Sequence, residues 1–144
     1  MRISEKIARI QAFDPLAVAE EAFNETSGSY ADLNAEQMFA GQTADDRVIT
    51  LDGRKGYSRN TFEIKKKKGQ PTDRITLRDT GAFHRGLYAT LKNGKIITSS
   101  TDSKADEIEE RTGKQIFGLN EGNKKTFATG VFLRRVLAKS KRRL

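Results

Sequence analysis

The residues best suited to chemistry lie at 79–84, where a carboxylate, a hydroxyl and an imidazole occur close together. Asp79 could exchange a proton, and His84 is the single histidine of the chain. Catalysis by an imidazole needs a partner nucleophile or acid, and none stands at a recognisable spacing from His84. We therefore expect His84 to be structural, either exposed or half-buried. With one histidine and no cysteine, the chain offers no multi-histidine or thiolate metal site, and we expect no metal or cofactor.

The segment Asp79-Thr80-Gly81, followed by Ala82, resembles the active-site signature of retroviral-type aspartic proteases. That resemblance implies a homodimer in which two aspartates share a proton and activate water. The family places an apolar residue before the aspartate, whereas this chain has Arg78, whose charge would keep Asp79 ionised. The Gly-rich flap strand of the family is also missing. We expect instead that Asp79 is structural: it caps backbone N–H groups or pairs with a nearby arginine, so that its replacement by alanine costs on the order of 1 kcal/mol.

Charge is the second feature with functional meaning, since the net charge is +8 and the pI about 9.8. Lysines occupy 65–68, and a basic tail contrasts with an acidic run that starts at Asp102. Such asymmetry suits either nucleic acid or acidic protein neighbours. We expect the tail to meet the acidic run of an adjacent copy, with duplex DNA as the competing neighbour. The candidate interface residues are Glu107, Glu109, Glu110, Arg134, Arg135, Lys139, Lys141, Arg142 and Arg143.

The elements around these residues include one hairpin that the sequence predicts clearly. Asn93-Gly94 separates two alternating segments, and both residues tolerate the positive φ angles that a type I′ turn requires. This pattern predicts paired strands near 87–92 and 95–100. Asp79, Thr80 and Gly81 are expected to form a turn or helix start just before the first strand.

Helices are predicted on both sides of this hairpin. Ile3, Ile7 and Ile10 recur at helical spacing, and Asp14-Pro15 is a strong helix start. The expected helices cover 3–12, 15–24 (ended by 26–29), one turn at 34–39, 59–68, a segment from Ser103 as N-cap to Thr112, and 121–142. Short strands are expected at 30–33 and 47–51, and 74–78 also alternates.

These elements predict an α+β fold with a small antiparallel sheet, flanked by N-terminal helices and a C-terminal helix. The chain has the length of one domain, which we divide into a helical arm (1–25), a central unit (28–120) and a basic helix (121–144). Hydrophobic residues make up 35 %, which is low for a chain that folds alone. The composition therefore favours a subunit that completes its core against neighbours. No signal peptide or membrane span is expected.

Three stretches together resemble a family of bacteriophage virion proteins: 30–41, 75–87 and 116–119. The family comprises small head–tail joining, tail-completion or virion morphogenesis proteins, as in crAss-like and other phages of Bacteroidetes. The resemblance covers about residues 28–144, and the order of the three stretches carries it. In the broader family a Thr-Gly pair precedes a short helix and a β-hairpin, and a helix closes the chain.

This resemblance implies a structural protein without enzymatic activity that forms a ring around the DNA channel below the portal. Its expected partners are copies of itself and neighbouring portal, neck or tail proteins, with non-specific contact to channel DNA and no membrane. The expected location is the virion, after synthesis in the host cytoplasm. Two alternatives stay open: a small basic nucleic-acid-binding protein, and the dimeric protease that uses Asp79.

Overall fold

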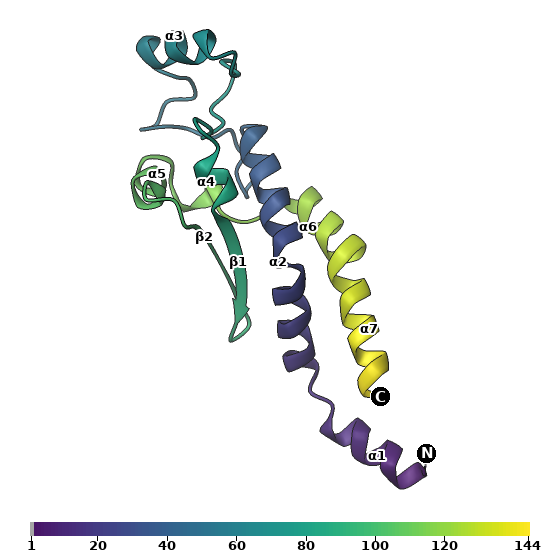
Figure 1. Cartoon of the computed structure of the whole chain (residues 1–144). Coiled ribbons are helices and arrows are strands. Elements are labelled where there is room, and N and C mark those ends of the chain that lie inside the picture. Colours follow the sequence, from purple (N-terminus) through teal and green to yellow (C-terminus); the bar gives the residue numbers. More distant parts are fainter. Residues whose placement is uncertain (1) are drawn as a thin grey trace.

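The computed structural model describes residues 2–144 and has an α+β architecture built on one long helix, α2 (Figure 1). A two-stranded antiparallel sheet lies against α2, and the last helical segment runs beside it. The helices are α1 (Ile3–Ala12), α2 (Pro15–Phe39), α3 (Arg59–Lys67), α4 (Ala82–Arg85), α5 (Ala105–Thr112), α6 (Glu121–Phe127) and α7 (Leu133–Arg143). The strands are β1 (Leu87–Lys92) and β2 (Lys95–Ser100), and a 3-10 turn (Lys114–Ile116) precedes α6.

Helix α2 starts as the sequence predicts and ends much later. The Asp14 carboxylate accepts hydrogen bonds from the backbone N–H groups of Leu16 and Ala17, and Pro15 occupies the first helical position. The predicted end at Asn24, the strand at 30–33 and the separate turn at 34–39 are wrong, because the helix continues to Phe39. It therefore also crosses the boundary that we placed between a helical arm and a central unit.

Residues 26–29 stay helical because packing before and after them outweighs their low helix propensity. Phe23 and Tyr30 are both buried, so the same helix face has partners before and after this segment. The hydroxyl of Thr26 donates to the carbonyl of Ala22 at 2.7 Å, which satisfies that side chain inside the helix. Gly28 lies in open space, since no atom outside its own helix turn lies within 4 Å of the position that a Cβ would occupy.

The core of the molecule consists of two adjoining clusters along α2. In one, Met38 packs with Ile49 and Ile75 from loops, Phe83 of α4, Leu87 of β1 and Ile116 at the end of the 3-10 turn. The other is aromatic, with Phe23, Tyr30 and Phe127 in edge-to-face contacts. The ring centroids of Phe23 and Tyr30 lie 5.4 Å apart.

The predicted hairpin is confirmed. Lys92 pairs with Lys95, which leaves Asn93 and Gly94 as the turn with φ angles of 53° and 74°. Leu87 and Ala89 on β1 are buried against α2, while Tyr88 between them is exposed. The alternation of the sequence therefore matches the two faces of the strand.

The alternating segments 47–51 and 74–78 form no ladder, so the predicted strand at 47–51 is wrong. Val48 and Leu51 make only isolated bridges, to Gln42 and Arg54. Ile49 and Ile75 are instead buried individually from extended loops, since no neighbouring strand is available to either segment.

The remaining helices follow the prediction with two differences. Helices α1 and α3 lie where expected, and Ser58 caps α3. Ser103 does not cap α5, which begins after Lys104; the Asp102 carboxylate accepts the Lys104 N–H at 2.8 Å. The C-terminal helix is capped by Asn120 and contains a π-helical segment (Ala128–Phe132) around Gly130.

Candidate functional site

Asp79 lies in an exposed ion pair close to the end of α3. Its carboxylate accepts a hydrogen bond from the Lys68 ammonium at 2.6 Å, and this bond lowers the pKa of Asp79 below its usual value. The expected arginine partner and backbone cap are therefore wrong, since the partner is a lysine. In a proton-sharing aspartate pair one carboxyl group must have a raised pKa, and the pair with Lys68 acts in the other direction.

Thr80 and Gly81 start α4, as the sequence predicts. The Thr80 hydroxyl accepts a hydrogen bond from the N–H of Ala82 at 3.3 Å. Gly81 has a φ of 87°, and a Cβ there would lie 2.6 Å from the Arg85 guanidinium. Glycine is therefore required for the chain to turn into α4.

His84 is half-buried and forms a structural hydrogen bond. Its Nε2–H donates to the carbonyl of Thr76 at 2.8 Å, and the N–H of Thr76 donates to the Tyr57 hydroxyl at the same distance. Burial lowers the pKa of His84 and so favours the neutral ring. Within residues 2–144 it contacts no carboxylate or hydroxyl through a hydrogen bond. Its role is to fix the loop that precedes α4.

The structure divides the lysines at 65–68 into two pairs with different roles. Lys65 is buried: its ammonium donates to the carbonyl of Arg78 at 2.9 Å and lies 4.8 Å from the Tyr57 ring centre. Lys68 pairs with Asp79, whereas Lys66 and Lys67 are exposed. Half of this basic segment therefore holds α3 to the 70–79 loop.

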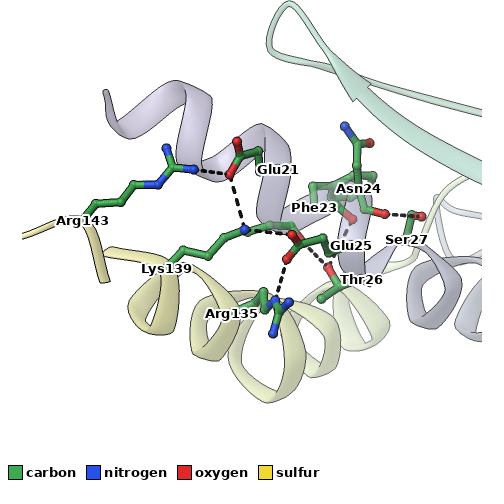
Figure 2. Close-up of polar contacts among 10 residues, drawn as sticks. Glu21, Phe23, Asn24, Glu25, Thr26, Ser27, Arg135, Lys139 and Arg143 are labelled. Atoms are coloured by element: carbon green, nitrogen blue, oxygen red, sulfur yellow. Dashed lines mark hydrogen bonds and ion pairs between the residues drawn. The ribbon is translucent and has the colours of Figure 1, made fainter. Parts of the chain in front are cut away.

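The basic C-terminal helix is held to α2 by an ion-pair cluster (Figure 2). The Glu25 carboxylate meets Arg135 at 2.6 Å and Lys139 at 2.8 Å. Glu21 meets Lys139 and Arg143. These hydrogen bonds, from Arg143 and Lys139 to Glu21 and from Lys139 and Arg135 to Glu25, lower the pKa of both carboxyl groups.

This cluster corrects the expectation that the basic tail meets only an adjacent copy or DNA. Arg135, Lys139 and Arg143 find their acidic partners inside the same chain, on a helix that we predicted to end before Glu25. The other predicted cations are Arg134, Lys141 and Arg142, which are exposed and form no ion pair within residues 2–144.

The predicted acidic surface lies on α5. Glu107 and Glu110 are exposed and Glu109 is half-buried, and none forms an ion pair with another described residue. The only charge of α5 that pairs is Arg111, which binds Asp52 at 2.9 Å; that hydrogen bond raises the pKa of Arg111. An uncompensated acidic face therefore remains on this helix.

Helix α1 is the most exposed element of the described chain. None of its residues is buried, and Ile3, Ile7 and Ile10 are 79 %, 49 % and 60 % exposed. Figure 1 shows α1 projecting beyond the body of the molecule at the start of α2. A ten-residue helix is marginal in water unless its apolar face is covered.

The sequence did not reveal a buried pair of amides that joins α2 to the segment before α6. The Asn34 side chain donates to the carbonyl of Ile116 and accepts from the N–H of Gly118, both at 3.0 Å. Gln37 donates to the carbonyl of Gly118 and accepts from the N–H of Asn120. The only available signal was the i, i+3 spacing of two amides beside apolar residues.

Residues 2–144 contain no group of three or more acidic or histidine side chains placed to bind a metal ion. No helix in the same range is both long and apolar enough to cross a membrane. No protein-family model, curated protein or solved structure matched this chain.

Proposed function

We propose that this chain is a structural subunit of a bacteriophage virion that assembles with its own copies into a ring around the DNA channel. The ring would belong to the neck, the head–tail connector or the tail. The observation that carries this proposal is the exposed apolar face of α1, with Ile3, Ile7 and Ile10 uncovered. A subunit that stays monomeric has little reason to keep such a face on a projecting helix.

The proposal also draws on the resemblance to phage neck and tail-completion proteins. The three stretches that carry this resemblance pack on one another in this fold. Met38 from the first, Ile75 and Phe83 from the second and Ile116 from the third belong to one cluster of buried residues. Residues far apart in sequence thus form one structural unit.

The test is the association state of the purified chain, followed over a wide range of concentrations by sedimentation velocity. We expect defined oligomers for the full chain and a monomer for a variant without residues 2–13. The triple variant Ile3→Ser, Ile7→Ser, Ile10→Ser keeps the length but removes the apolar face. We expect it to be a monomer like the deletion variant, which separates the effect of the apolar face from that of chain length. Mass spectrometry and labelled-particle imaging of purified virions then test the location. A monomer at every concentration, absent from particles, would overturn the proposal.

The nucleic-acid-binding alternative rests on α3. Lys66 and Lys67 are exposed, and Arg59 lies seven residues before Lys66, on the same side of the helix. Backbone contacts by such cations would give binding that falls steeply with salt. Filter binding of duplex DNA at several salt concentrations distinguishes this alternative from the ring subunit. A monomer whose affinity for DNA falls steeply with salt would favour nucleic-acid binding.

A further inference from the structure

Helix α7 has two faces with different roles. Its inner face carries Arg135, Lys139 and Arg143, which bind the glutamates of α2. The opposite face presents Leu133 and Leu137, which are 49 % and 51 % exposed and stand four residues apart. This face is also basic, because Arg134 follows Leu133 directly and Lys141 stands four residues after Leu137. We call it the outer face of α7.

A complementary surface exists elsewhere on the same chain. Asp106, Glu107 and Glu110 are exposed on α5 and lack ion pairs within the described residues. Figure 1 shows α5 beside the hairpin, in a different part of the molecule from the C-terminal end of α7. One chain therefore cannot bring the two surfaces together in this fold.

A recess of mixed polarity lies next to the acidic surface. It has a volume of about 180 Å³, and its large apolar lining residues are Leu77, Phe83 and Ile108 of α5. Its charged lining residues are Asp79, Asp102 and Lys104, and Asp79 is already paired with Lys68. A leucine side chain beside a cation would thus find a few apolar side chains and a carboxylate in one place.

We infer that the outer face of α7 of one copy docks against α5 of a second copy. This inference rests on the proposed ring and names one of its contacts. The charges of the two surfaces are opposite, and neither surface has an ion-pair partner among residues 2–144. Because the two surfaces differ, the contact is heterologous, and repeating it generates a ring when the rotation closes.

Other occupants are less well matched to the same face. Duplex DNA would bind Arg134 and Lys141 but offers no apolar surface to Leu133 and Leu137. An anionic membrane would accept both kinds of side chain. It would leave the acidic surface of α5 without a role, whereas a second copy uses both surfaces.

The experiment uses charge reversal on each surface of the full chain. The α7 variant is Arg134→Glu with Lys141→Glu, and the α5 variant is Glu107→Lys with Glu110→Lys. Arg135, Lys139, Arg143 and the half-buried Glu109 stay unchanged, because changing them would disturb α2 packing or burial. The control is Lys92→Glu with Lys95→Glu, exposed cations that face each other across the hairpin and form no ion pair with a described residue.

Sedimentation velocity at low salt should show self-association weakened about tenfold or more in the α7 and the α5 variants, and unchanged in the control. The variant that carries all four substitutions should regain association, because the contact reforms with its charges exchanged. An equimolar mixture of the α7 and α5 variants should associate better than either alone. Circular dichroism and thermal unfolding confirm that each variant is folded.

Three results would overturn the inference. The first is unchanged assembly in the α7 and α5 variants, which leaves the ring but places its contact elsewhere. The second is loss of assembly without recovery in the four-substitution variant. The third is binding to anionic vesicles that the α7 variant loses while self-association persists. A wild-type chain that never associates would refute the proposed function itself.

Discussion

The C-terminal part of α2 and the two ends of the chain are held by different forces. In the C-terminal part of α2, Asn34 and Gln37 are 0 % and 2 % exposed and bind the 116–120 segment through buried hydrogen bonds. At the ends, α1 buries no residue, and α7 is joined to α2 largely through exposed ion pairs. The same helix, α2, thus carries both kinds of contact.

This difference matters because buried and exposed polar contacts have unequal energies. A buried hydrogen-bonding group left without its partner costs about 1–3 kcal/mol, whereas an exposed ion pair contributes about 0–1 kcal/mol. The C-terminal part of α2 should therefore dominate the stability of one chain. The ends contribute little to it and remain free to bind neighbouring subunits, as the proposed assembly requires.

The largest expected effect is at the buried amides of α2. Asn34→Ala should lower the free energy of unfolding by about 2–4 kcal/mol, because the carbonyl of Ile116 and the N–H of Gly118 both lose their partner. Urea denaturation measures the change. The matched control is Asp32→Ala, an exposed position on the same helix. Equal effects of the two substitutions would contradict the role of the buried amide.

The hairpin that packs on α2 should be the next most sensitive feature. Gly94→Val should cost about 1–3 kcal/mol, since a β-branched residue resists the φ of 74°. No atom lies within 4 Å of a Cβ at this position, so the cost comes from the backbone alone. Gly56→Val, at a glycine with similar open space and no such φ, is the control. An unchanged melting temperature in Gly94→Val would contradict the turn.

The ion-pair cluster at the end of α7 should have a smaller, pH-dependent effect. The lowered pKa values of Glu21 and Glu25 mean that their contribution is present above about pH 4.3, the usual glutamate pKa, and is lost as pH falls through the lower folded values. The double variant Glu21→Gln, Glu25→Gln should melt below the wild type at pH 7. The two curves should converge in acid.

Glu20→Gln is the control for this cluster, because Glu20 has no ion pair with a described residue. Its melting temperature should follow the wild type across the same pH range. A gap between the double variant and the wild type that persists at pH 2 would show that the effect is not electrostatic.

The smallest effect is expected at Asp79. Asp79→Ala should cost roughly 0–1 kcal/mol, less than a helix cap, since its pair with Lys68 is exposed. Lys68→Ala should have a similar effect, and the double variant should cost no more than one single variant. A cost of several kcal/mol would place Asp79 with the buried amides of α2 instead.

Local signals allowed much of the secondary structure to be predicted. Asn93-Gly94 fixed the hairpin, and Asp14-Pro15 fixed the start of α2, because turns and caps depend on side chains within a few residues. The helical spacing of the isoleucines was sufficient to predict α1, because this pattern is also local. Among the candidate site residues, the exposure of Glu107, Glu110 and Arg134 also followed from their charge alone.

The tertiary structure decided what depends on distant partners. Thr26 to Ser29 became helical because Phe23 and Tyr30 pack on Phe127, which lies a hundred residues later. The 47–51 segment stayed a loop because no strand lies beside it. Packing of the basic helix along α2 placed Arg135, Lys139 and Arg143 beside Glu21 and Glu25, and so divided its cations into an inner and an outer set. Local sequence determines caps, turns and charge; long-range packing determines which of those charges remain free for a partner.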